Sequence, residues 1–331
     1  MNNTSAKSYS LTDVFGLARS KQEVLSEILN DKELRLRYFD FPEQQQEELV
    51  GFLMGKNGLR ITYDTFFRKI FHPDDHPERL EALLGSILGQ PIHIEQVLQR
   101  EGHRLHGESS LVIMDIVVRL SDGSIMDVEI QKVGYAFPGE RSCCYASDLI
   151  MRQYEREKQL AHEAKKPFSF RSMKPVYVIV IMENSPEPFL EAAPYYMHRK
   201  TTVYDSHVQI AELSNIIYIS LDTFHKVVQN IDTPLHAWLT FLSAWKAEDI
   251  LKLVNAFPQF VELYQELAAF RTRTEDIMSF FSEALLMMDH GTAEYMCEEM
   301  KKEIAQLKDE KAQLRDENAA LREQLARLQR E

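Results

Sequence analysis

One segment limits the fold more than any other: residues 176–182, VYVIVIM, are apolar at every position. Side chains alternate between the two faces of a strand, so this strand is apolar on both faces. Strands of that kind are buried in sheets that are covered on both sides. The segment therefore predicts a fully buried strand.

Helix and strand candidates lie on both sides of this segment. Helices are predicted over 63–71, 77–89 and about 141–164, with two or three short ones between 20 and 55 and a helical region from 222 to about 298. Strands are predicted at 91–99, 111–120, 124–131, 195–204 and 215–221, and a loop at 184–194. We expect an N-terminal helical extension (1–60), an α/β domain (61–221), a helical region (222–298) and a C-terminal segment (299–331).

Charge and cysteine content narrow the function classes. The formal net charge of −13 argues against a protein that coats nucleic acid non-specifically, because such binding needs Lys and Arg to neutralise phosphates. Residues 141–174 are an exception, with eight Lys and Arg against four Asp and Glu. Three cysteines give neither a disulfide framework nor a metal knuckle. With no membrane span or signal sequence predicted, we expect a cytoplasmic protein.

The stretch MDIVVRLSDGSIMDVEIQK (114–132) resembles a hairpin that carries acids on its strands. A three-residue loop ending in Gly123 would pair Leu120 with Ser124, so that paired residue numbers sum to 244. Asp115 and Glu129 would then lie directly opposite on one face, with Cβ atoms ~5 Å apart. A two-residue Asp-Gly turn is the alternative, and it would put Glu129 out of step.

Facing carboxylates are destabilising unless a cation lies between them or one is protonated. Mg²⁺ is a common partner, since it is held by one or two carboxylates plus waters and phosphate oxygens. Gln131 points to the same side and could orient a water or a phosphate. The alternative, which spacing leaves open, is that these are exposed acids on the solvated face of an antiparallel sheet.

The C-terminal segment has a heptad pattern. In a parallel dimer, oppositely charged residues at positions g and e′ of the two helices would attract each other. Asn318, at one a position, favours a two-stranded register. The sequence predicts a homodimeric coiled coil, with a solvated single helix as the alternative. The a and d residues are Ile304, Leu307, Lys311, Leu314, Asn318, Leu321, Leu325 and Leu328.

At the hairpin the sequence resembles the PD-(D/E)XK nuclease superfamily, and more closely its recombination-promoting nuclease and transposase family. The signature of that family is an Asp on one strand followed by Glu-x-Gln on the next, here Asp115 and Glu129-Ile130-Gln131. The segments YDTFFRKIF (63–71) and RSCCYASDLIMRQY (141–154) resemble its flanking helices. The resemblance covers about residues 61–221. It implies a central mixed sheet flanked by helices and metal-dependent hydrolysis of DNA phosphodiesters.

The resemblance also implies roles for single residues. Asp115 and Glu129 would hold Mg²⁺, or Mn²⁺, with the Ile130 carbonyl as a third ligand. The ion would stabilise charge on the phosphate and lower the pKa of the attacking water. Gln131 stands where the superfamily has Lys, so it could position water but offers no positive charge. Further candidates are Asp64 as an additional acid, or else a helix N-cap or first-turn acid, and Arg141, Tyr145 and Arg152 as DNA-binding residues, or structural ones.

Three functions follow as hypotheses. The first is a dimeric Mg²⁺-dependent DNA endonuclease linked to recombination or transposition. The second is a catalytically inactive nuclease-like scaffold that assembles through its coiled coil, which the missing Lys and the acidic charge favour. The third, an RNase H-like transposase, fits less well because its acids lie farther apart in sequence than Asp115 and Glu129.

Overall fold

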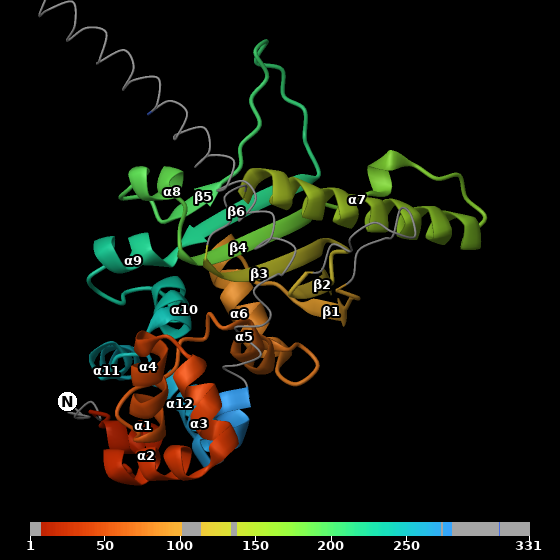
Figure 1. The fold of residues 1–331 in the computed structure, drawn as a ribbon. Helices are drawn as coiled ribbons and strands as arrows, with labels where there is room; N and C mark the ends of the chain where they lie inside the picture. The colour runs from red at the N-terminus through yellow and green to blue at the C-terminus, as the bar shows by residue number, and fades with distance from the viewer. Residues whose placement is uncertain (1–7, 101–113, 134–137, 273, 280–310, 312–331) are drawn as a thin grey trace, which may run out of the picture. The chain divides into compact units, whose positions relative to one another are not determined.

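The core of the computed structural model is a mixed six-stranded sheet, and the structure describes residues 8–100, 114–133, 138–272, 274–279 and 311 (Figure 1). The strand order is β1-β2-β3-β4-β6-β5. Strands β3, β4 and β6 are parallel, and the other neighbours are antiparallel. The bounds are β1 Ile94–Val97, β2 Ile116–Leu120, β3 Ile125–Val133, β4 Val176–Asn184, β5 Met197–Arg199 and β6 Ser214–Ser220. The apolar segment 176–182 lies in β4, between β3 and β6, and is largely buried, as predicted.

The turn between β2 and β3 is the three-residue one. Leu120 N–H donates to the Ser124 carbonyl, and Gly123 has a φ of 89°. Ile116 pairs with Val128 and Val117 with Asp127, so paired residue numbers sum to 244. The two-residue alternative is therefore not formed, because only the left-handed conformation of glycine at position 123 closes this loop without strain.

Helices cover both faces of the sheet, and each face has its own apolar cluster (Figure 1). Helix α7 (Pro138–Glu163) covers one face through Tyr145, Ala146 and Leu149, which pack on odd-numbered residues of β3 and even-numbered residues of β4. The opposite face packs against α5 (Asp64–Phe71), α6 (Pro77–Leu88) and α10 (Pro234–Ser243). The predicted α/β core flanked by helices is confirmed.

Of the remaining helices, α1, α9, α11 and α12 contribute buried residues to the apolar cluster on that opposite face. Ser10 and Ser20 are the N-caps of α1 and α2 and form capping boxes. In each box the backbone N–H of the serine donates to the carboxylate of Asp13 or Glu23. Pro42 separates α3 from α4 as the sequence suggests. The bounds are α1 Leu11–Phe15, α2 Lys21–Asn30, α3 Lys32–Asp40, α4 Glu43–Leu53, α8 Glu187–Glu191, α9 Leu221–Val227, α11 Ala247–Ala256 and α12 Phe260–Ala269.

Three sequence-based predictions differ from the structure. The predicted loop 184–194 contains the short helix α8, which Pro186 precedes. The strand predicted over 195–204 is only Met197–Arg199, because beyond it Lys200 and Thr202 bond to Glu212 through side chains. On the first hairpin arm the strand begins at Ile116, so Asp115 lies just before it.

Two predictions, the coiled coil and the domain boundaries, are not tested by the structure. The coiled coil, Ile304 to Leu328, lies outside the described residues apart from Lys311. The boundaries at 60/61 and 221/222 stay predictions, although residues from all three regions they separate share one apolar cluster. Within the described residues, no helix is both long and apolar enough to cross a bilayer.

Candidate active site

Asp115 and Glu129 lie side by side at the end of the hairpin opposite its turn. The Glu129 carboxylate accepts a hydrogen bond from Asp115 N–H at 2.9 Å, and the Asp115 carboxylate accepts one from Ile130 N–H at 2.8 Å. Each acid therefore reaches across to the backbone of the other strand. The predicted juxtaposition of Asp115 and Glu129 is present, and two backbone amides fix it.

Asp127 and Gln131 share the face of Glu129, under α7. Asp127 is fully buried, Glu129 is 3% exposed and Gln131 is 5% exposed. Both carboxylate oxygens of Asp127 and the Oε1 of Gln131 are without a hydrogen-bond partner among the described residues. The reading of these side chains as exposed acids on a solvated face is wrong, because α7 covers that face.

Burial and mutual repulsion shift the acidity of this cluster. Burial raises the pKa of the Glu129 carboxyl well above its usual range and Asp127 raises it further, while Arg141 opposes the shift. Burial and the charge of Asp115 raise the pKa of Asp127 in the same way. In the absence of a cation, the cluster is therefore stabilised by holding protons.

The predicted DNA-binding residues all lie on α7. Arg141 donates to the Tyr145 hydroxyl at 2.5 Å and lies 5.2 Å from that ring, whose residue is buried against the sheet. Arg152 pairs with Asp148 at 2.7 Å and donates to the Gln99 carbonyl. Arg141 and Arg152 both favour the ionised form of Asp127, so α7 brings positive charge to the acids. A phosphate contact by any of the three stays a prediction.

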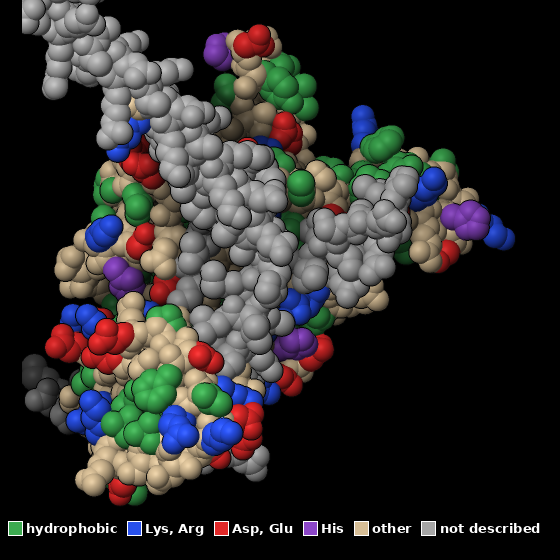
Figure 2. Space-filling view, viewed as in Figure 1, with side chains coloured by type: hydrophobic (Ala, Val, Ile, Leu, Met, Phe, Trp, Pro, Cys, Tyr) green, Lys and Arg blue, Asp and Glu red, His purple; other side chains and the backbone are tan. Residues whose placement is uncertain are grey.

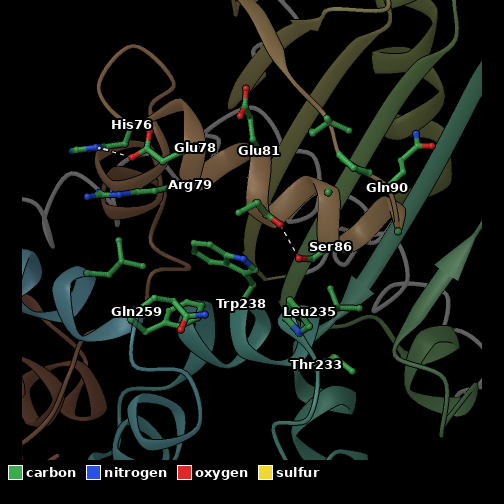
Figure 3. A pocket seen from close by; sticks show the side chains of 18 of the residues that line it. His76, Glu78, Arg79, Glu81, Ser86, Gln90, Thr233, Leu235, Trp238 and Gln259 are labelled. Atoms are coloured by element: carbon green, nitrogen blue, oxygen red, sulfur yellow. Dashed lines mark hydrogen bonds and ion pairs between the residues drawn. The ribbon is translucent and has the colours of Figure 1, made fainter.

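A groove lined by helices lies apart from the acidic cluster. A cavity of about 1060 Å³ is bounded by α6, α10 and the start of α12, with Arg79, Trp238 and Gln259 among its lining residues (Figure 3). None of the predicted site residues lines it. The groove is therefore separate from the acidic cluster.

Comparison with known families agrees with this geometry. The family model described as PD-(D/E)XK nuclease family transposase matches residues 61–324, which is 264 of the 331 residues. The chain belongs to this family. Neither a curated protein nor a solved structure gives a significant match. Members of the PD-(D/E)XK nuclease family are generally nucleases, and divalent metals are their usual cofactors.

The cluster suits the chemistry of a divalent metal in this family. Its donors are all oxygens, which Mg²⁺ prefers, and three of those oxygens are buried without a partner. Among the described residues, no three His, Cys, Asp or Glu side chains converge as a metal-binding group. The residues fit the ion in the chemistry of their oxygen donors, but within the described part of the chain they are not gathered into a ready ligand set, because the carboxylates of Asp115 and Glu129 bond to backbone amides.

The sequence alone assigned no role to two neighbours of the site. The alternation of Asp127 with Glu129 and Gln131 on one face is visible in the sequence, but it left Asp127 equally open as a solvent-facing strand residue and as a second-metal ligand. Arg100 donates to the Met114 carbonyl at 2.7 Å and lies 4.0 Å from the Asp115 carboxylate. No spacing rule relates residues 100 and 115.

Asp64 and Ile130 are the remaining predicted site residues. Asp64 is the first residue of α5, and its side chain lies outside the described part of the structure. Ile130 follows Glu129 on β3, and its N–H is bound by Asp115. Their roles as an additional acid and as a carbonyl ligand stay predictions.

Proposed function

We propose that this chain is a metal-dependent DNA endonuclease that hydrolyses phosphodiester bonds. The observation that carries the proposal is the reciprocal bonding of Asp115 and Glu129, beside buried, partnerless oxygens of Asp127 and Gln131, in a member of the PD-(D/E)XK nuclease family. A cluster of buried acids whose pKa values stay raised despite neighbouring arginines is costly to a fold. Its presence on this face is explained by a role in catalysis.

In this proposal Asp115 and Glu129 hold Mg²⁺ or Mn²⁺, with the Ile130 carbonyl as a third ligand. When bound, the ion stabilises charge on the phosphate and lowers the pKa of the attacking water. Gln131 orients the water through its free Oε1, and Asp64 adds a further acid. Arg141 and Arg152 bring positive charge from α7, and Tyr145 holds the Arg141 guanidinium in place.

The substrate reaches the site from the side of Asp115. The Asp115 side chain is 15% exposed, whereas Asp127, Glu129 and Gln131 are nearly covered. Arg100 flanks that opening at 4.0 Å from the Asp115 carboxylate and is itself 37% exposed. A phosphate that approaches Asp115 would therefore meet a cation that the sequence did not suggest.

The test is cleavage of supercoiled plasmid with Mg²⁺ or Mn²⁺. The wild-type chain is compared with Asp115→Ala/Glu129→Ala and with Glu95→Ala, which removes an exposed acid from β1 of the same sheet. We expect cleavage that needs the metal, survives in Glu95→Ala and is lost in the double variant. Metal-supported nicking by the double variant would refute the proposal.

A second candidate function is a catalytically inactive scaffold. It is favoured by the two backbone amides that already satisfy Asp115 and Glu129, and by Gln131 in place of a cationic Lys. A scaffold needs no Mg²⁺ site, so an unchanged melting temperature on adding Mg²⁺ together with an uncut plasmid would favour it over the endonuclease.

Three further parts of the proposal rest on sequence patterns. The heptads from Ile304 to Leu328 would join two chains, so that two sites could cut both strands. The family description suggests a link to recombination or transposition. We place this activity in the cytoplasm.

A further inference from the structure

The second half of α7 has no sheet to cover. The buried residues of this helix end at Gln153, although the helix continues to Glu163. Beyond Gln153 the helix extends past the edge of the sheet, and the following segment turns back through a short 3-10 turn, Phe170–Ser172 (Figure 1). Residues 154–174 therefore form a projecting arm.

Three aromatic rings pack against each other near the base of this arm, where the returning segment meets Tyr154. The Phe170 ring is stacked on Tyr154, with centroids 6.2 Å apart and planes 20° apart. Phe168 meets both rings edge-on, at 5.3 Å from Tyr154 and 5.0 Å from Phe170. Phe170 is nevertheless 74% exposed. A stacked ring pair thus presents an apolar face to solvent on a rigid support.

The arm that carries this face is rich in cations. The arm carries six Lys and Arg against three Glu, and only Arg156 forms an ion pair within the described part of the chain, with Glu157 at 2.9 Å. Lys158 lies 5.5 Å from the Tyr154 ring. Figure 2 shows Lys and Arg side chains around exposed hydrophobic ones on this projecting part. The six cations are Arg156, Lys158, Lys165, Lys166, Arg171 and Lys174.

We propose that the arm 154–174 binds an unpaired DNA strand, with a base stacked on Phe170 and phosphates on the cations of the arm. The inference rests on the proposed nuclease function for the identity of the nucleic acid. Base stacking on an exposed ring is open only to unpaired nucleotides, because duplex bases are already stacked on each other. Lys158 beside the Tyr154 ring and the excess of Lys and Arg along the arm complement the phosphate backbone.

The helix connects this arm to the candidate active site. Arg141 lies beside Glu129 and Tyr154 begins the arm, 13 residues later on the same helix. At a rise of about 1.5 Å per residue, the separation is ~20 Å, which corresponds to roughly six nucleotides of duplex. The arm would therefore hold DNA that is unpaired about six nucleotides from the cut, which defines a junction or frayed end as the substrate.

The test is binding of a fluorescein-labelled dT12 oligomer to the full chain by fluorescence anisotropy, in EDTA and at fixed salt. The variants are Phe170→Ala and Phe170→Trp, and the matched control is Phe39→Ala, since Phe39 is 63% exposed on α3. We expect Phe170→Ala to weaken binding about 10-fold. Phe170→Trp and Phe39→Ala should bind like the wild type, and a 12-base-pair duplex should bind Phe170→Ala within twofold of wild type.

An abasic dT12 analogue separates stacking from charge. It should bind the wild type about as weakly as dT12 binds Phe170→Ala, and it should bind both proteins alike. The proposal is overturned if dT12 binds Phe170→Ala and Phe39→Ala equally well, or if Phe170→Ala loses as much affinity for the duplex as for dT12. It is also overturned if the wild type does not bind dT12, or if it binds oligo(U) more tightly than dT12.

Failure of this proposal is distinguishable from failure of the nuclease function. Binding is measured without metal, so a chain that holds dT12 through Phe170 and never cuts plasmid refutes only the nuclease. If the wild type cuts plasmid, and if wild type and Phe170→Ala bind dT12 equally well, only the proposed role of the arm is refuted.

Discussion

Replacing Glu129 by Gln tests whether the acidic cluster lowers the free energy of unfolding of the protein. Glu129 is 3% exposed, lies beside the buried Asp127 and has a raised pKa. Gln keeps an oxygen for the Asp115 N–H, so the hydrogen bond weakens by ~1 kcal/mol while a buried like charge disappears. We expect a net gain of about 1–2 kcal/mol in the metal-free protein at pH 8. That corresponds to a rise of roughly 2–4 °C in Tm.

The pH dependence has a definite sign. A carboxyl whose folded-state pKa is raised contributes stability below its unfolded pKa, and this contribution is lost as pH rises through the folded pKa. The metal-free wild type should therefore lose stability between pH 5 and pH 8, and Glu129→Gln should lose less. Adding Mg²⁺ at 100 times its Kd should restore ~2.7 kcal/mol to the wild type and little to the variant.

The assay is thermal denaturation followed by circular dichroism, in EDTA and in Mg²⁺, at pH 5.5 and 8. Glu48→Gln is the matched control because Glu48 is equally buried but accepts from Arg60 N–H at 2.9 Å and from its guanidinium at 3.3 Å. The same substitution there should destabilise by ~2 kcal/mol at both pH values. If Glu129→Gln loses stability like Glu48→Gln, the cluster is structural and our reasoning is wrong.

Three further predictions concern the surroundings of the site. Gly123→Ala should lower stability by ~1–2 kcal/mol, measured by urea denaturation, because φ is 89° and the new methyl would lie 3.3 Å from Lys174. Arg141→Gln removes a cation beside Glu129 and Asp127 and should lower the stability of the metal-free protein at pH 8 by ~1 kcal/mol, measured by thermal denaturation in EDTA. Deleting residues 299–331 should convert a dimer into a monomer in light scattering after gel filtration, and an unchanged mass would contradict the heptad reading.

The pairing of Asp115 with Glu129 was predictable because it is local. A glycine turn of fixed length sets the register of two strands that follow each other directly, and alternation then sets the faces. The burial of 176–182 was predictable for a similar reason, since apolar side chains on both faces need two covering layers.

The burial of Asp127 was not predictable from the hairpin. Its exposure depends on α7, which begins 11 residues later and covers the odd-numbered face through Tyr145 and Leu149. The ion pairs of Arg60 with Glu48 and Glu183 join residues as far as 123 positions apart. Such pairs depend on the packing of whole elements, which no spacing in the sequence expresses.

The first helices are joined to the last ones of the described core. Phe15 packs edge-on against Tyr264 at 5.9 Å, and the Arg271 guanidinium donates to the Leu17 and Leu53 carbonyls at 3.1 and 3.2 Å. These contacts span more than 200 residues. During synthesis, the helices that emerge first must wait for residue 271 to leave the ribosome before they can complete their packing. Completion of the fold is therefore a late, non-local event, and a chain released before that residue would expose an apolar surface to aggregation.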